Sequence, residues 1–345
     1  MPFFKTLEQC YLIAEIGVNH GGDLSLAKTM VEEAKKAGAD AVKFQTFTAE
    51  NLVTNFTPKV EYQKQTTPED ETHYNMIKSL ELSRDDHYLL KEFCESLQID
   101  FISTPYDIES AQFLTDLGVK IIKIASADIV DIPLLEYVAS TKISVILSAG
   151  MATLGEIEQA INIFNEAGSN DFVLLHCVSN YPCQYKSLNM KVLTTYKTAF
   201  NVVVGFSDHS IGPVASILSI ALGAIVVEKH FTTDKSLPGP DHRASSTPNE
   251  FSELASYIRT AEESLGTSIK LCHDEEREMA KVSRKSVVLA RSVKVGEIIT
   301  KDHLTTKRPG TGISPINIRN IIGKKTRNNL QKDSLIKWSD LEELI

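Results

Sequence analysis

The chain has 345 residues, of which 42% are hydrophobic and 23% are charged, a composition that is ordinary for a globular protein. No apolar run approaches the roughly 20 residues that a membrane helix needs, and we expect no signal peptide. The five cysteines include no Cys-x-x-Cys pair, so we expect reduced thiols and a cytoplasmic location. These features exclude a membrane-spanning protein and argue against a secreted, disulfide-linked one.

The formal net charge of −9 is unevenly distributed along the chain. Residues 284–345 hold 13 basic and six acidic residues, whereas the preceding residues carry a net charge of −16. A basic segment on an acidic body predicts an anionic partner, either nucleic acid or a small molecule, although a solvated basic face explains the charge equally well. The only aromatic residue of this segment is Trp338, which argues against a nucleic-acid site built on stacking.

Eight short apolar runs alternate with segments of helical periodicity. The predicted strands are Tyr11–Ile16, Ala41–Phe44, Asp100–Ser103, Ile121–Ala125, Ser144–Leu147, Phe172–Cys177, Val202–Phe206 and Ile225–Glu228. The predicted helices include Leu24–Ala37, Arg84–Leu97, Ile108–Leu117, Leu154–Glu166 and Gly212–Leu222. The strands are near-continuous apolar runs, as expected for parallel strands that are buried on both faces.

Eight strand–helix units over about 265 residues match the size of a (β/α)8 TIM barrel. A doubly wound open sheet is the structural alternative, but residues 17–22 do not have the glycine spacing of its first turn. The connection from Thr46 to Ser83 is long, which is typical of a functional loop, and a helix is predicted within it over Pro68–Leu80.

The sequence pattern changes after residue 266. We expect a barrel domain over residues 1–266, a polar linker over 267–283 and a small, mostly β domain over 284–345. Within the last domain, Ser286–Ala290 and Ile298–Thr300 have the composition of short strands.

Two histidines follow neighbouring strands of the predicted barrel, His209 after the seventh and His230 after the eighth. Both lie at the carboxyl ends of the strands, where barrel enzymes carry their chemistry, and neutral imidazoles there can share one ion. We therefore predict a divalent-metal site whose open positions are filled by water, substrate or a carboxylate, as in a catalytic Lewis acid. Asp208 and Glu228 either orient these histidines or join the metal shell.

Lysines in strand interiors indicate a bound anion. Lys43 or Lys123 alone could pair with a glutamate of a neighbouring strand, but both together, with several hydroxyls at the same end, favour a phosphate or carboxylate ligand. Glu15 closes an apolar strand, so burial should raise its pKa and suit it to proton transfer, unless it only pairs with a lysine. Asp241 lies in a Pro/Gly-framed loop, where it either binds sugar hydroxyls, moves protons or pairs with Arg243.

Seven segments resemble the sialic acid synthase family, the last of them through its antifreeze-like (SAF) domain. They are Ala14–His20, Val42–Phe47, Ser103–Pro105, Gly205–His209, Glu228–Thr232, Leu237–Asp241 and Lys307–Ile313. This resemblance covers nearly the whole chain and implies a TIM barrel followed by a SAF domain. It also implies a transferase that condenses phosphoenolpyruvate with the open-chain aldehyde of N-acetylmannosamine or a related N-acyl hexosamine. The products would be a nonulosonic, sialic-acid-type 2-keto acid and phosphate.

The resemblance further implies a role for individual residues. Those expected to bind phosphoenolpyruvate are Lys43, Thr104, Lys123, Ser126, Ser179 and Ser207. Those expected to contact the sugar are Gln45, Asp128, Tyr181, Asp241 and Arg308. Glu15 and Asp241 are the candidates for proton transfer, and His209 and His230 would hold Mn²⁺, with Mg²⁺ or Co²⁺ as alternatives. Arg308 would reach the barrel of a partner subunit, which makes the protein a domain-swapped homodimer.

Departures from the family pattern leave the sugar open. Asp128 stands where the family often has glutamate, and Ala149 replaces a frequent threonine near the acceptor pocket. N-acetylmannosamine, its 6-phosphate and diacetamido sugars therefore all remain candidates.

The competing functions are a metal-dependent aldolase acting on pyruvate or a sugar phosphate, and a nucleic-acid-binding protein that uses the basic tail. Of these functions we prefer the synthase, and we therefore expect the protein to bind small-molecule substrates and neither nucleic acid nor a membrane.

Overall fold

A computed structural model describes residues 2–68 and 70–342, apart from the side chains of residues 62 and 65. The chain divides into two compact units, residues 1–266 and 267–345, and each is described by itself. Within the described residues, no helix is long and apolar enough to cross a membrane.

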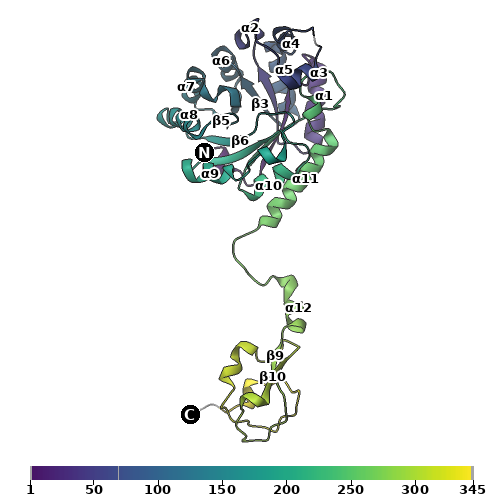
Figure 1. The fold of residues 1–345 in the computed structure, drawn as a ribbon, viewed down its shortest axis with the longest axis vertical. Helices are drawn as coiled ribbons and strands as arrows, with labels where there is room; N and C mark the ends of the chain where they lie inside the picture. The colour runs from purple at the N-terminus through teal and green to yellow at the C-terminus, as the bar shows by residue number, and fades with distance from the viewer. Residues whose placement is uncertain (1, 69, 343–345) are drawn as a thin grey trace. The chain divides into compact units, whose positions relative to one another are not determined.

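The first unit is a closed barrel of eight parallel strands in chain order, with β8 pairing back onto β1 (Figure 1). The strands are β1 (Tyr11–Gly17), β2 (Ala41–Thr46), β3 (Asp100–Pro105), β4 (Ile121–Ile124), β5 (Ser144–Ser148), β6 (Phe172–Cys177), β7 (Val203–Asp208) and β8 (Val226–His230). Each predicted strand overlaps an observed one, and the predicted (β/α)8 barrel is confirmed.

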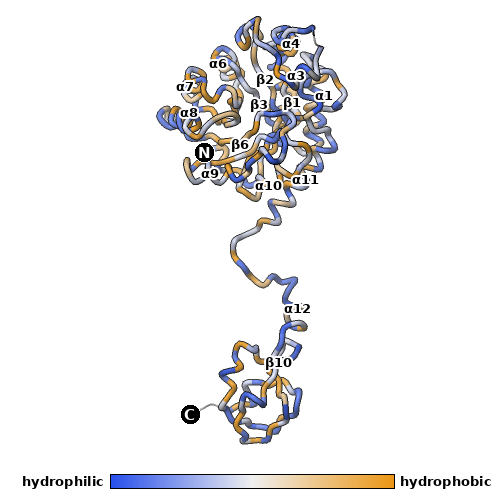
Figure 2. Tube along the Cα trace, viewed as in Figure 1, coloured by the Kyte–Doolittle hydropathy of each residue, from blue (hydrophilic) through white to orange (hydrophobic). Residues whose placement is uncertain are grey.

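Helices follow each strand and cover the outside of the barrel. They are α1 (Leu24–Lys36), α5 (Arg84–Ser96), α6 (Ile108–Leu117), α7 (Ile132–Thr141), α8 (Leu154–Glu166), α9 (Val192–Phe200), α10 (Val214–Ala221) and α11 (Pro248–Leu265). Figure 2 shows polar and apolar stretches alternating along these helices, as expected when one face packs on the sheet. Local signals set their ends: α8 begins in a capping box, in which Thr153 and Glu156 each bond the other's backbone N–H.

The long connection after β2 forms an insertion over residues 47–83. It holds three short helices, α2 (Ala49–Leu52), α3 (Glu61–Thr66) and α4 (His73–Ser79), where a single helix was predicted. A small apolar cluster packs α4 against the barrel mouth through Val18, Phe47, Met76 and Leu80.

The barrel interior changes from apolar to polar along the strands. Its lower layers hold the buried side chains of Tyr11, Ile13, Ala41, Ile102, Ile121, Ile146, Val173, Leu175 and Val226. Since side chains alternate across a strand, the next inward position lies two residues closer to the carboxyl end. Those positions carry Glu15, Lys43, Thr104, Lys123, Ser148, Cys177, Ser207 and Glu228. The strand pattern alone therefore gathers the reactive side chains at one end.

The second unit contains α12 (Asp274–Ser283) and a two-stranded antiparallel sheet of β9 (Ser286–Leu289) and β10 (Leu304–Lys307). The segment expected to be a polar linker thus includes a helix. The prediction of a strand over Ile298–Thr300 is wrong: Ile298 makes one isolated bridge, and the chain then enters a short 3₁₀ turn at Lys301.

Candidate active site

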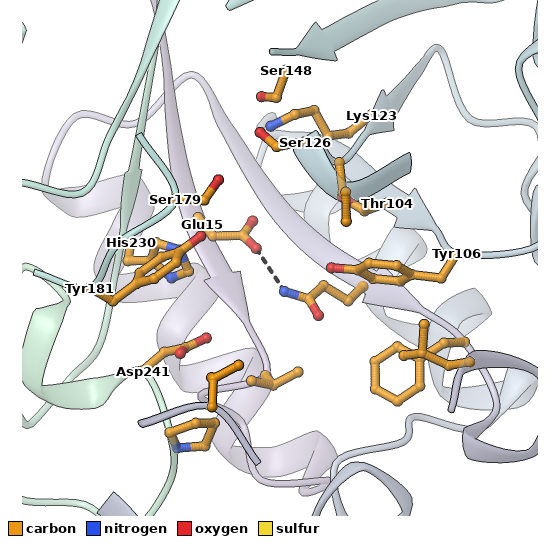
Figure 3. A pocket seen from close by; sticks show the side chains of 18 of the residues that line it. Glu15, Thr104, Tyr106, Lys123, Ser126, Ser148, Ser179, Tyr181, His230 and Asp241 are labelled. Atoms are coloured by element: carbon orange, nitrogen blue, oxygen red, sulfur yellow. Dashed lines mark hydrogen bonds between the residues drawn. The ribbon is translucent and has the colours of Figure 1, made fainter. Parts of the chain in front are cut away.

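A cavity of about 440 Å³ opens at the carboxyl ends of the barrel strands. Its lining includes twelve of the residues singled out from the sequence: Glu15, Lys43, Gln45, Thr104, Lys123, Ser126, Ser179, Tyr181, Ser207, His209, His230 and Asp241. In Figure 3, Lys123, Ser126, Ser148 and Thr104 lie on one side of this cavity, with Tyr181, His230 and Asp241 on another. The insertion supplies a further, apolar part of the lining.

Two lysines and two glutamates form a buried charge network inside the barrel. Lys43 Nζ lies 2.7 Å from Glu15 Oε2 and 3.9 Å from Glu228 Oε2, and it donates to Thr104 Oγ1 at 3.1 Å. Lys123 Nζ donates to both oxygens of Glu228, at 2.7 and 2.6 Å. The network is formally neutral, so an anion that enters it meets two ammonium groups already held in place.

Burial and pairing shift the pKa of each member in a different direction. Burial raises the pKa of Glu15 despite the nearby Lys43. For Glu228, burial is outweighed by Lys123 and Lys43, which hold its pKa low. Burial lowers the pKa of Lys123, whereas Glu15 and Glu228 overcome burial at Lys43 and raise its pKa. Glu15 is therefore the acidic residue of this network that is best suited to exchange a proton.

Hydroxyl groups lie so close to Gly150 that a side chain at this position would collide with them. The Gly150 N–H donates to Ser126 Oγ at 3.0 Å, and a Cβ at this glycine would lie 2.4 Å from Ser179 Oγ and 2.8 Å from Ser126 Oγ. The buried Oγ of Ser148 has no hydrogen-bond partner among the described residues. The hydroxyls of Ser126, Ser148 and Ser179 all line the cavity, and together they form a cradle that can donate to an anionic oxygen.

The two histidines face each other across the ends of β7 and β8, with ring centroids 5.4 Å apart. His209 Nδ1 lies 2.9 Å from the carbonyl oxygen of Val178 and donates to it, which leaves Nε2 as the nitrogen that can bind a metal. Burial lowers the pKa of His209, but Cys177 outweighs burial and raises it, so a metal ion at Nε2 would have to displace a proton. Burial, then repulsion by His209, lowers the pKa of His230 well below its usual range, and its buried Nδ1 has no partner in the described part of the chain. Tyr181 packs on both rings, with centroids 4.1 and 5.5 Å away.

These two imidazoles suit a divalent cation that takes its remaining ligands from water or substrate. Across residues 2–68 and 70–342, no group of three or more His, Cys, Asp or Glu side chains is arranged as a complete metal shell. An ion held here would have two histidine ligands and open positions, and its presence stays a prediction.

A second buried ion pair stands behind the histidines. Lys229 Nζ lies 2.9 Å from Asp208 Oδ2 and donates to the Ser210 carbonyl at 2.7 Å. Ser216 of α10 donates to the same carboxylate oxygen at 2.6 Å. Because Asp208 precedes His209 and Lys229 precedes His230, this pair ties together the two strand ends that carry the histidines.

Glu15 is positioned by an irregularity in β1. The pairing of β1 with β2 shifts between Glu15 and Gly17, and Gln45 Nε2 donates to Glu15 Oε1 at 3.2 Å (dashed in Figure 3). Gly17 has a φ of +56°, and a Cβ there would lie 2.8 Å from Glu15 Oε1. A glycine at this bulge therefore leaves room for the carboxylate.

Two residues expected to contact the sugar are not part of this cavity lining. Asp128 lies in a 3₁₀ turn after β4, half-buried, and Arg308 is an exposed residue of the second unit. Their roles stay predictions.

Two polar residues of the strands that line the cavity, Ser148 and Cys177, were not among the predicted site residues, and Glu228, expected to orient a histidine or join the metal shell, pairs with Lys123 and Lys43. Each sits at an inward position that the two-residue period of its strand specifies, so strict use of that period would have found them. Burial raises the pKa of the Cys177 thiol, but His209 outweighs this effect and lowers it to about 7.

Comparison with known proteins adds evolutionary relationships to this geometry. The model of the NeuB family matches residues 30–270, and that of the SAF domain matches residues 284–342. The N,N'-diacetyllegionaminic acid synthase of Legionella pneumophila is 47% identical over 96% of this chain and 95% of its own length. The protein of the same name from Campylobacter jejuni is 42% identical over 96% of this chain and all of its own. The crystal structure of an N-acetylneuraminic acid (sialic acid) synthetase from Leptospira borgpetersenii, in complex with citrate, is 37% identical. It superposes with a TM-score of 0.70 over 79% of this chain and 90% of that one.

Proposed function

Because this chain belongs to the NeuB family and contains a SAF domain, we propose that it is a phosphoenolpyruvate-dependent nonulosonic acid synthase. It joins phosphoenolpyruvate to the open-chain aldehyde of N-acetylmannosamine or a related N-acyl hexosamine. The products are a sialic-acid-type 2-keto acid and inorganic phosphate, which makes the enzyme a transferase. The relatives carry names for different nonulosonic acids, so family membership leaves the acceptor open.

One observation carries this proposal: two buried lysines and a hydroxyl cradle share a cavity with two facing histidines. The lysines and hydroxyls suit an anionic donor, and the histidines suit a metal ion that binds an aldehyde. The proposed condensation needs both in one cavity. A metal-dependent aldolase acting on pyruvate would need the metal side, but not a phosphate cradle with two lysines.

The donor is held by the cationic side of the cavity. Lys43 and Lys123 pair with its carboxylate and phosphate, and the hydroxyls fix its orientation. The hydroxyls are those of Thr104, Ser126, Ser179 and Ser207. Holding both anionic ends directs the enol carbon at the acceptor, and such alignment is a large part of the rate of a two-substrate reaction.

The acceptor occupies the side near the histidines. Gln45, Tyr181 and Asp241 contact the sugar. His209 and His230 hold a divalent cation, Mn²⁺ foremost, whose chemistry is to polarise the aldehyde oxygen. Arg308 of a partner subunit contacts the N-acyl group, so the enzyme works as a domain-swapped homodimer, and we place it in the cytoplasm.

The proposed reaction consumes phosphoenolpyruvate, the aldehyde and one water molecule. C3 of phosphoenolpyruvate forms a bond to the aldehyde carbon, whose oxygen takes up a proton and becomes a hydroxyl. Water adds to C2 and gives its proton to Glu15 or Asp241. The C2–O bond to phosphate then breaks as the new C2 hydroxyl becomes the ketone. Glu15 is the stronger candidate for this proton, since burial raises its pKa toward the working range.

The test is phosphate release from phosphoenolpyruvate with N-acetylmannosamine, its 6-phosphate or a diacetamido sugar as acceptor. We expect release with at least one acceptor, loss of release with EDTA, and recovery when Mn²⁺ is restored. Consumption of pyruvate in place of phosphoenolpyruvate, or the absence of phosphate with every acceptor, would reject the synthase in favour of the aldolase.

A further inference from the structure

The turn after β1 contains a buried asparagine that has no role in the proposed reaction. Asn19 is 1% exposed and is not part of the cavity lining. Its Nδ2 donates to the carbonyl oxygen of Phe231 at 2.9 Å and to Ser245 Oγ at 2.9 Å. Phe231 directly follows β8, and Ser245 follows the loop that contains Asp241. One side-chain amide therefore joins the end of β1 to two points beyond β8.

The first of these bonds replaces a backbone bond that the bulge in β1 removes. The Phe231 N–H donates to the Glu15 carbonyl oxygen at 2.7 Å, one step beyond the pairing of Glu15 with His230. In a regular parallel ladder, the N–H of residue 17 would next donate to the Phe231 carbonyl oxygen. The bulge instead pairs Gly17 with a residue of β2. The side chain of Asn19 supplies the missing donor.

The second bond of Asn19 leads to the loop that carries Asp241. Ser245 Oγ accepts from Asn19 and in turn donates to the Asp241 carbonyl oxygen at 2.8 Å. Ser245 is 2% exposed, so bulk water has little access to these bonds. Asp241 lines the cavity, and in Figure 3 it lies on the same side as Tyr181 and His230. The two bonds therefore connect Asn19 to the backbone of a cavity residue.

Stability alone does not explain a buried amide at this position. A carbonyl oxygen only accepts hydrogen bonds, so the nitrogen of Asn19 must face Phe231. This orientation leaves Asn19 Oδ1 buried without a hydrogen-bond partner among the described residues. An unsatisfied buried acceptor costs stability, and proteins retain such groups mainly where function needs them. The arrangement therefore favours a role in positioning.

We propose that Asn19 is a positioning residue for the acceptor side of the cavity. It holds the segment from Phe231 to Ser245 against β1, and this sets Asp241 in place relative to Glu15. These two carboxylates are the candidates for proton transfer, so their relative position affects the rate of the reaction. The kinetic consequence rests on the proposed function, whereas the effect on the segment does not.

Hydrogen exchange tests the effect on the segment without substrate or metal. The reporters are the N–H groups of Thr232 and Ser246, which bond the carbonyl oxygens of Ser246 and His230 at 3.0 and 2.7 Å. Asn19→Leu preserves size and burial but removes both donors, so exchange of these amides should accelerate by about tenfold. Tyr11→Phe is the matched control. It removes a side-chain hydrogen bond of 2.7 Å at the opposite end of β1, and exchange of the two amides should stay as it is.

Kinetics distinguish positioning from a general loss of structure. With an acceptor that supports phosphate release, Asn19→Leu should lower kcat by about tenfold and raise KM for the acceptor. The Kd of phosphoenolpyruvate, measured by calorimetric titration, should change by less than about twofold, because Asn19 bonds only the segment beyond β8. Ser245→Ala should reproduce part of the loss in kcat, and the double variant should lose no more than Asn19→Leu alone. Tyr11→Phe should keep the kinetic constants of the unmodified enzyme.

The outcomes separate this inference from the proposed function. Absence of phosphate with every acceptor rejects the synthase, whereas hydrogen exchange still decides whether Asn19 holds the segment. Unchanged exchange of the two amides in Asn19→Leu overturns the positioning role. Equal weakening of donor binding and acceptor turnover overturns it as well, as do losses in Asn19→Leu and Ser245→Ala that simply add. If Asn19→Leu does not fold, as judged by circular dichroism, Ser245→Ala decides the question by the same two measurements.

Discussion

Burial raises the pKa of Asp128, and no positive charge in the described part of the chain offsets this effect. The carboxylate is half-buried after β4, and its Oδ2 has no hydrogen-bond partner among the described residues. Burial, then repulsion by Asp131, raises its pKa to about 7. A folded-state pKa above the unfolded value of 3.8 means that the contribution of this group to stability is present at low pH. That contribution is lost as the pH rises from about 4 to about 7.

Asp128→Asn should therefore stabilise the protein at pH 8 by about 2 kcal/mol, roughly half of what a three-unit shift implies, because water still reaches the side chain. The gain should vanish near pH 4. Urea unfolding at both pH values measures it, with the exposed Asp116→Asn as control. A variant of unchanged stability whose KM for the acceptor rises would instead support the role in sugar binding that the sequence suggests.

Most of the site could be predicted at the level of residues, since polar groups at strand ends meet at one mouth of a barrel. That geometry places Lys43, Lys123 and His230 together regardless of detail. It does not reach Ile77 or Leu52, because an apolar residue that lines a cavity and one that fills a core look alike in sequence. Only the path of the insertion distinguishes them.

At the level of elements, the Asp208–Lys229 pair joins β7 to β8 behind the histidines. Both side chains are almost fully buried, with relative exposures of 1% and 4%. Removing one partner of such a pair leaves a charge in a low-dielectric interior, at a cost of about 3–5 kcal/mol. Because each partner directly precedes a histidine, we expect the pair to hold His209 and His230 in register as well as to add stability.

Lys229→Met should lower the free energy of unfolding by about 3–5 kcal/mol, and adding Asp208→Asn should recover much of that loss. The double variant should still bind Mn²⁺ more weakly by calorimetric titration, because the two histidines are no longer held in register. Lys120→Met is the control: its pair with Asp100 is exposed, and its loss should cost less than about 1 kcal/mol. Unaltered Mn²⁺ affinity in the double variant would limit the pair to stability.

The strands could be predicted more accurately than the short elements. Each barrel strand is a largely apolar run that tertiary contacts reinforce, whereas α2 to α4 have four to seven residues each and depend on contacts with the barrel mouth. The same limit explains the error at Ile298–Thr300, where a β-rich triplet has too few residues to form a ladder.

At the scale of the whole molecule, the proposed exchange of domains would complete each cavity with an arginine from the other subunit. Arg308 is exposed in the second unit, on a segment that follows β10. This unit carries the excess of positive charge, which suits a cover for a cavity that holds anions.

Coexpression of two inactive variants tests the exchange. His209→Ala damages one barrel and Arg308→Ala damages one SAF domain, so a mixed dimer with exchanged domains has one intact site. Half of the dimers formed at random are mixed, and about a quarter of normal activity should return. Activity no higher than that of the separate variants, with mixed dimers demonstrated by differential tags, would place Arg308 in its own subunit's site or in none.

The apolar lower layers of the barrel impose an order of events on the proposed reaction. Isoleucine and valine side chains fill the barrel interior beneath the lysines, so the cavity opens toward the carboxyl ends of the strands. If the proposed donor binds at Lys43 and Lys123, it lies deeper than an acceptor at the histidines, so we expect the donor to bind first. We likewise expect the 2-keto acid to dissociate before the phosphate that lies deeper in the cavity. A new molecule of phosphoenolpyruvate would then bind only after phosphate has been released.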